Sequence, residues 1–193
     1  MEQVPTKQEQ CITSYMNFET ELATIVNNEI RSQCEKVLSA VDKQFFIAPA
    51  SSTGKYHPDY ALGEGGLYRH TCAAVKIANS LLELDGYKKD FSEDLQDYIR
   101  AALILHDTCK SGIVWESEHT VFEHPLLVKE LMLQVLGDCE FTQTVDDLVK
   151  THMGQWTTSK YSKIVLQSPQ SAAQLFVHTC DYLASRKFIE VKL

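Results

Sequence analysis

The sequence predicts an all-α protein, a helical bundle of about six or more helices. Apolar residues recur three or four positions apart over most of the 193 residues, the period of a helix buried along one face. Strand-like alternation is weak everywhere, and Gly, Pro and Ser residues separate the periodic segments. Because no repeat or low-complexity linker divides the chain, we expect a single domain over residues 1–193.

The first predicted helix covers residues 17–41 and dominates an N-terminal helical region, residues 1–41. Its apolar residues have mainly helical spacing, with charged residues between them. The next 25 residues, 42–66, are rich in Pro, Gly and Ser and exceed the usual length of a connector, which is typical of a functional loop. This loop ends at the pair Gly65 and Gly66.

The second and third predicted helices follow this loop. The second extends from Leu67 to Leu84, and Gly86 is expected to stop it. The third begins after Ser92, whose hydroxyl can cap the first turn, and closes with "ALILHD", residues 102–107.

The fourth and fifth predicted helices are bounded by cap residues and glycines. Pro125 suits the first position of the fourth helix because it needs no N–H donor there, and Gly137 suits its end. Thr142 is the expected cap of the fifth helix, and Gly154 is expected to stop it.

The last predicted helix starts with Ser168 as the cap and Pro169 as the first residue. It runs to about Arg186, and residues 187–193, "KFIEVKL", form a tail. These six segments complete the predicted bundle.

Composition limits the partners that we expect. The net charge of −8 disfavours long nucleic acid, which binds through clustered Lys and Arg, but permits a small anion held by local positive charge. No apolar stretch approaches the roughly 20 residues that span a bilayer, and no leader peptide precedes the first segment, so we expect a cytoplasmic protein without a membrane partner. Six cysteines at wide intervals are expected to be reduced thiols.

Titratable residues interrupt the apolar faces of five predicted helices. They are His70, His106, His124, His152 and Asp181. Asp107 adjoins one of them, and no Lys or Arg lies on these faces to neutralise the two aspartates, whereas a metal cation would do so. Three other histidines, His57, His119 and His178, lie off such faces.

Each histidine taken alone is more often a hydrogen-bonded core residue than a ligand. Four inward histidines and two aspartates in one chain of this length instead match a mixed imidazole and carboxylate metal site. Such a donor set suits Mn, Fe, Co, Ni or Zn.

The order of these residues resembles that of the HD-domain metal-dependent phosphohydrolases over residues 45–187. Their H…HD…D pattern is matched by His70 in "GGLYRHT", His106 and Asp107 in "LHDTCK", and Asp181 in "HTCDYLASR". The extended pattern of dinuclear members, such as cyclic-nucleotide and cyclic-dinucleotide phosphodiesterases, is matched by His124 in "FEHP" and His152 in "THMGQW". The resemblance implies an all-α HD phosphohydrolase core.

The loop before His70 is most similar to that of HD-type 3′-to-5′ exoribonucleases. The chain differs from this superfamily at Thr108 and Cys109, where a small apolar residue and Gly are frequent. It also lacks the nucleic-acid-binding domain of those nucleases, so the expected substrate is a small phosphorylated molecule, foremost a nucleotide.

The resemblance implies two divalent ions, drawn from Mn, Fe, Co, Ni, Zn or Mg. The first would be held by His70, His106, Asp107 and Asp181, and Asp107 would bridge to a second held by His124 and His152. Two such ions lower the pKa of a bridging water, which can then attack phosphorus. A phosphoester bond would be hydrolysed by this metal-activated water, with Asp107 as a catalytic residue.

Other residues are candidates for contacts to the substrate. Lys110 is the second catalytic candidate, as a phosphate clamp or a proton-transfer assistant; a solvated lysine at a helix end is the equal alternative. Trp156 is expected to stack a nucleobase, with core packing as the alternative, and Trp115 is a weaker candidate.

Lys55, His57 and Arg69 flank the glycine-rich loop, where a helix N-terminus can receive an anion. Ordinary loop polarity is the alternative for these three residues. Together with Trp156 they form the predicted substrate-binding set.

Four functions remain open from the sequence. The first is hydrolysis of a nucleotide or short phosphodiester, and the second is triphosphohydrolase activity on a deoxynucleotide. A non-catalytic metal-binding or nucleotide-binding HD module and a di-iron oxygenase are the others. A homo-oligomer is compatible with each of them.

Overall fold

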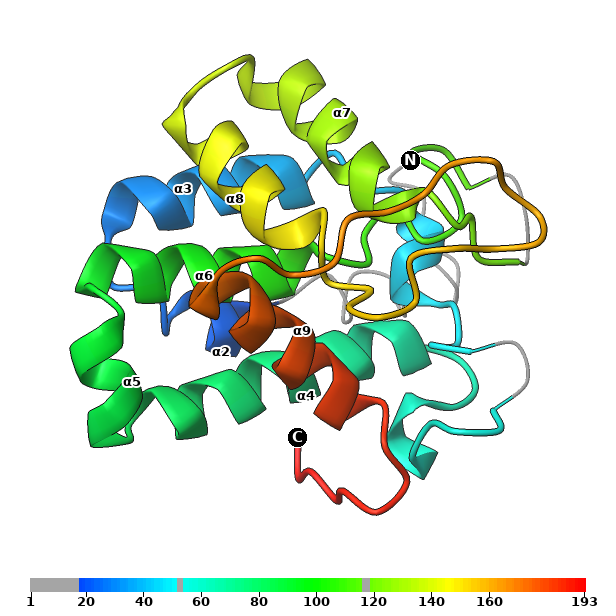
Figure 1. The fold of residues 1–193 in the computed structure, drawn as a ribbon, viewed down its shortest axis with the longest axis horizontal. Coiled ribbons are helices and arrows are strands. Elements are labelled where there is room, and N and C mark those ends of the chain that lie inside the picture. The colour runs from blue at the N-terminus through cyan, green and yellow to red at the C-terminus, as the bar shows by residue number, and fades with distance from the viewer. Residues whose placement is uncertain (1–17, 52–53, 116–118) are drawn as a thin grey trace, which may run out of the picture.

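The computed structural model describes residues 18–51, 54–115 and 119–193, and this part of the chain is all-α, as predicted (Figure 1). It contains eight α-helices and no strand. The helices are α2 (Glu19–Leu22), α3 (Asn28–Leu38), α4 (Gly66–Leu82), α5 (Asp85–Asp90), α6 (Glu93–Leu105), α7 (His124–Leu136), α8 (Glu140–Val149) and α9 (Ala172–Ala184). Two short 3₁₀ helices, Lys43–Phe46 and Asp59–Ala61, lie between α3 and α4.

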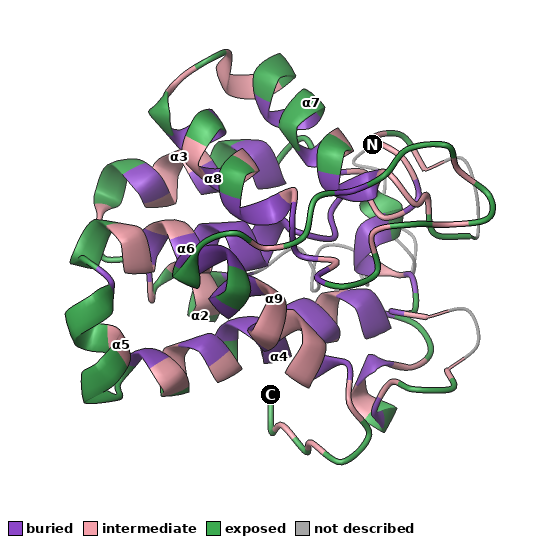
Figure 2. Cartoon of the chain, viewed as in Figure 1, coloured by how far each residue is buried: buried purple, intermediate pink, exposed green. Residues whose placement is uncertain are grey.

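Helix α6 forms the centre of the bundle. It packs against α3, α4, α8 and α9, and Figure 1 shows it between α3 and α4. Its residues Ala101–Leu105 are completely buried, and Figure 2 shows buried residues gathered on α6 and on neighbouring faces of α4 and α8. The C-terminal end of α6 therefore lies inside the protein core.

The prediction of one long helix over residues 17–41 is wrong. Residue 17 lies outside the described residues, and the rest forms two helices, α2 and α3, separated by residues 23–27. Asn27 caps α3, because its side chain accepts hydrogen bonds from the N–H groups of Glu29 and Ile30. Its own N–H donates to the carboxylate of Asp97 on α6 at 2.7 Å, which fixes the break against the core.

The predicted stop at Gly86 is also wrong. Helix α4 ends at Leu82, and Gly86 lies inside the short helix α5. Aromatic packing accounts for the extra helix: Tyr87 and Phe91 each pack edge-to-face against Phe176 of α9, with ring centroids 4.8 and 5.4 Å away. This contact between distant segments outweighs the low helix propensity of a single glycine.

Two predicted caps lie at the wrong residues. Helix α8 begins at Glu140, and Thr142 is already inside it. The segment Ser168–Pro169 precedes the last helix without joining it; Ser171 caps α9 in a reciprocal capping box with Gln174. The predicted cap Ser92 and the predicted end at Gly137 are confirmed for α6 and α7.

No helix in the described part of the chain has both the length and the apolar character needed to cross a membrane. The five cysteines in this part are free thiols, and four of them are buried.

Candidate metal centre

Six polar side chains from five helical segments meet at the inner end of α6. Helix α4 supplies His70, the end of α6 supplies His106 and Asp107, and α9 supplies Asp181. His124 is the first residue of α7, and His152 lies in the turn after α8. All are buried except Asp181, whose side chain is 19% exposed. The structure thus brings together the whole set of predicted ligands.

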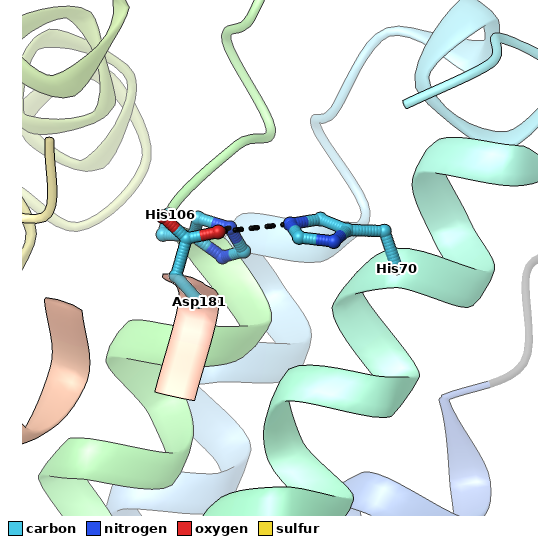
Figure 3. Close-up of side chains that lie close together, drawn as sticks. All are labelled: His70, His106 and Asp181. Carbon is cyan, nitrogen blue, oxygen red and sulfur yellow. Dashed lines mark hydrogen bonds and ion pairs between the residues drawn. The ribbon is translucent and has the colours of Figure 1, made fainter. Parts of the chain in front are cut away.

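The first cluster consists of His70, His106 and Asp181 (Figure 3). The Nε2 atom of His70 lies 3.0 Å from Oδ1 of Asp181, and Nε2 of His106 lies 3.5 Å from the same oxygen. In Figure 3 the His70 ring and the carboxylate point toward each other from α4 and α9.

The second cluster consists of Asp107, His124 and His152. Oδ1 of Asp107 lies 3.1 Å from Nε2 of His124 and 3.7 Å from Nε2 of His152. The two histidine Nε2 atoms are 3.1 Å apart.

The carboxylate of Asp107 faces both clusters. While Oδ1 points to the second cluster, Oδ2 lies 3.5 Å from Nε2 of His106 and 3.9 Å from Nε2 of His70. One carboxylate therefore connects the two clusters.

Main-chain hydrogen bonds orient three of the imidazole rings. In His106, His124 and His152, the Nδ1–H group donates to the carbonyl of the residue three positions earlier, at 2.7–2.8 Å. The acceptors are Leu103, Val121 and Val149. Since this proton resides on Nδ1, each neutral ring directs the lone pair of Nε2 into the cluster, as metal-binding histidines do.

The clusters fit a cation. Two Nε2 lone pairs 3.1 Å apart in His124 and His152 repel each other unless a proton or metal ion lies between them. Nε2 of His106 is buried and has no hydrogen-bond partner in the part of the chain that the structure describes. The donor set of imidazoles and carboxylates suits Mn, Fe, Co, Ni or Zn.

The pKa shifts show how strongly the cluster favours positive charge. Although burial opposes it, Lys110 and His106 hold the pKa of Asp107 well below its usual range. Burial likewise opposes ionisation of Asp181, but His106 and His70 lower its pKa. For His106, the two carboxylates outweigh burial and raise the pKa, whereas burial lowers the pKa of His124. The carboxylates therefore stay ionised inside the protein.

A cavity of about 250 Å³ opens onto the clusters. Five of the six side chains line it, as do Lys110, His57, Trp156, Tyr182 and Ser185. It is large enough for a small organic ligand to reach the cluster.

Lys110 forms an ion pair with Asp107, although the sequence places no Lys or Arg on the buried helix faces. Its Nζ lies 2.6 Å from Oδ2 of Asp107, and its side chain is 16% exposed. Pattern reading on the helix faces missed this pair because Lys110 belongs to the turn after α6.

The predicted loop residues lie in different surroundings. His57 lines the cavity, with its ring centroid 5.7 Å from that of His70, and burial, His70 and Lys110 lower its pKa to about 4. Lys55 is exposed and does not line the cavity. Arg69 also lies outside it and donates hydrogen bonds to the carbonyls of Tyr60 and Leu62, which fix the loop to α4.

The two tryptophans differ in position. Trp156 lines the cavity, is 44% exposed, and stacks on Tyr182 with centroids 5.9 Å apart and an interplanar angle of 19°. Trp115 lies outside the cavity lining, and its main-chain N–H donates to Oδ2 of Asp42 at 3.0 Å.

His178 is a supporting residue that sequence analysis placed off the buried faces. Its Nδ1–H donates to the carbonyl of His152 at 2.7 Å, so it fastens the turn after α8 to α9. It lies three residues before Asp181, and residues with that spacing share a helix face. This spacing is the signal that could have identified it.

A family model described as HD domain matches residues 67–186, a range that contains all six clustered side chains. No curated protein matches the chain, and neither does any solved structure.

Proposed function

Because the chain belongs to the HD-domain family, whose members are generally metal-dependent hydrolases, we propose that it is a metal-dependent phosphohydrolase. Its substrate would be a nucleotide or a short phosphodiester, in which it would hydrolyse a phosphoester bond. The observation that supports this proposal is the arrangement of two histidine clusters around the divided carboxylate of Asp107, at the floor of a cavity.

Two divalent ions would occupy the two clusters. His70, His106 and Asp181 with Oδ2 of Asp107 would hold one, and His124 and His152 with Oδ1 would hold the other. Bound ions of this kind supply Lewis acidity at a phosphoryl oxygen and an acidified water for attack on phosphorus.

The chain itself would bind and orient the phosphate. Lys110 lines the cavity with its Nζ 2.6 Å from Oδ2 of Asp107, and its ammonium group would donate to a non-bridging phosphate oxygen. His57, neutral at pH 7 because its pKa is about 4, would hydrogen-bond to the substrate without adding charge. Trp156 would stack a nucleobase, a contact worth about 1–3 kcal/mol.

The test combines metal analysis with a substrate panel. Protein supplied with Mn, Co, Ni or Mg is assayed on nucleotides and model phosphodiesters, and phosphorus NMR of the products separates diester hydrolysis from release of tripolyphosphate. The Asp107→Asn variant should lose bound metal, and its hydrolysis rate should fall at least about 100-fold, because the substitution removes the negative carboxylate proposed to contact both ions.

Asp97→Asn is the matched control. Asp97 is also buried on α6 but forms an ion pair with Arg100 at 2.8 Å and belongs to neither cluster. This variant should keep its metal and its activity even where its stability falls. Metal binding without turnover on the whole panel would favour a non-catalytic module instead.

A further inference from the structure

An arginine contacts two residues that line the cavity, Tyr182 and Ser185. Arg186 follows the end of α9, and its Nε and Nη2 groups donate to the hydroxyl of Ser185 at 3.1 and 2.8 Å. Ser185 lines the cavity. Within the described residues no Asp or Glu lies within ion-pair distance of Arg186. Arg31 and Arg69 also lack such a partner there, but both donate to main-chain carbonyls. Among the same residues, Arg186 donates only to the hydroxyl of Ser185.

Aromatic rings hold this guanidinium in place. Its central carbon lies 4.4 Å from the ring centroid of Tyr182 and 5.9 Å from that of Tyr56. Lys55 also approaches the Tyr56 ring, with Nζ 5.1 Å from the centroid. Two cations therefore gather around one ring at the edge of the cavity, although the protein as a whole is acidic.

The guanidinium keeps donors available for a ligand. Ser185 engages Nε and Nη2, while the Nη1 group has no acceptor among the described residues. A guanidinium presents its N–H groups as a planar fork that suits phosphate oxygens. Tyr182, Tyr56 and Ser185 hold the guanidinium in place but do not neutralise its charge.

The position of Arg186 separates it from the metal clusters. Arg186 lies beyond the C-terminal end of α9 and does not itself line the cavity, whereas Asp107 and Asp181 do. Its guanidinium contacts Tyr182 and Ser185, which are lining residues. An anion on Arg186 is therefore a different group from a phosphate lying over Asp107 and Asp181.

We propose that Arg186, held by Ser185, Tyr182 and Tyr56, forms a second anion subsite that binds a non-scissile phosphate of the substrate. The preferred substrates are then nucleotides that carry a second phosphate group away from the one that is hydrolysed. This inference rests on the proposed function for the site of the scissile phosphate. It adds the requirement for a second phosphate group on the substrate, which the metal clusters alone do not impose.

Binding to two probes tests the subsite. Adenosine 5′-monophosphate and adenosine 3′,5′-bisphosphate are titrated into the Ni-loaded protein by calorimetry, with phosphorus NMR to check that both stay intact. The bisphosphate should bind at least about tenfold more tightly, because it gains a charge-assisted contact. Arg186→Gln should remove this preference and leave the affinity for the monophosphate unchanged, and Arg186→Lys should keep part of it.

Lys187→Gln is the control, since it removes an exposed positive charge one residue away. It should keep the preference for the bisphosphate, and all variants should keep the metal content and melting temperature of the parent. Equal affinity of the parent for both probes overturns the subsite. So does an Arg186→Gln variant that weakens both probes equally, because that result indicates a structural role at the end of α9.

The hydrolysis assay distinguishes the two proposals. A preference for the bisphosphate that Arg186→Gln removes, with no hydrolysis of any substrate, retains the subsite and rejects the proposed function. Hydrolysis of singly and doubly phosphorylated substrates at equal kcat/KM, unchanged by Arg186→Gln, retains the function and rejects the subsite.

Discussion

The side chain of Asp107 is surrounded by groups that compensate its charge. Lys110, His106 and His124 all lie within 3.5 Å of its oxygens, and the carboxylate is 3% exposed. A buried carboxylate is costly unless it is paired, so these contacts are necessary for its presence in the core. Because several of these groups are histidines, the stability of the fold should depend on pH.

The stability of the metal-free protein should be greatest near pH 6.5, the ordinary pKa of histidine. Above this pH the unfolded chain loses the proton of His106 before the folded protein does, because carboxylates raise the folded pKa. Stability therefore falls as pH rises. Below it the unfolded chain protonates His57 and His124 first, because their folded pKa values are lowered, and stability falls as pH drops.

Urea unfolding in EDTA at several values between pH 5 and 8.5 measures this dependence. A free energy of unfolding that rises steadily from pH 6.5 to 8.5 would contradict the assignment for His106. Metal-loaded protein is the comparison, since metal ions displace these protons.

The convergence of the six candidate ligands could be predicted because each lies on or beside an apolar helix face. His152 shows this plainly, since the apolar residues that precede it at helical spacing are all buried in the core: Val145, Leu148 and Val149. The ion pair of Lys110 with Asp107 and the bond from His178 to His152 could not be predicted from those faces. They depend on the turns after α6 and α8, whose conformation the helical period does not specify.

At the level of elements, the helix interiors were predictable and several ends were not. The break before α3 depends on the bond from Asn27 to Asp97, 70 positions away, and α5 depends on aromatic contacts to α9. Local patterns carry no information on such partners. Ser92 and Gly137, by contrast, act through their own backbone neighbourhoods, and both were predicted correctly.

The cap of α9 provides a direct test of this difference. Ser171→Ala should lower the free energy of unfolding by about 1 kcal/mol, because it removes the acceptor for the N–H of Gln174. Ser168→Ala, at the cap that sequence alone suggested, should change it by less than about 0.5 kcal/mol. Thermal or urea unfolding of both variants checks the prediction, and a larger loss from Ser168→Ala would contradict the observed start of α9.

The turn that carries His152 depends on a close approach between Gly154 and His178. Gly154 has φ +62°, and a Cβ atom there would lie 2.1 Å from Cε1 of His178. Gly154→Ala should therefore cost about 2 kcal/mol or more and reduce the affinity for metal, because the ring must move from the carbonyl of His152.

Gly137→Ala is the matched control for this substitution. Gly137 also has a positive φ, +76°, but a Cβ there meets no atom within 4 Å. It should lose stability through backbone strain alone and keep its metal affinity. If calorimetry finds the same metal affinity in both variants, His178 does not position the turn.

For the whole molecule, the cluster joins segments that are far apart in the sequence. Its six residues span positions 70–181 and connect α4, α6, α7, the turn after α8, and α9. Ions bound at the two clusters would together contact all of these segments, and only in the folded state. Metal binding would therefore be coupled to folding of most of the chain.

Metal at 100 times its dissociation constant should stabilise the protein by about 2.7 kcal/mol. For a chain of this size, that corresponds to a rise of about 5–10 °C in melting temperature. Calorimetric melting with and without EDTA measures the shift, and Asp107→Asn should show little of it. An unchanged melting temperature in saturating metal would argue against the proposed ligands.

The bonds that aim three of the histidine rings end on carbonyl oxygens of the polypeptide, which every amino acid possesses. Replacing Leu103, Val121 or Val149 therefore leaves the acceptor in place, so evolution is free to vary these side chains within the limits of packing. Changing the chain length is different. One residue inserted between acceptor and ring would lengthen this three-residue span and direct the imidazole away from the cluster. The arrangement of the rings should therefore tolerate substitutions at the acceptor positions but not insertions or deletions next to the histidines.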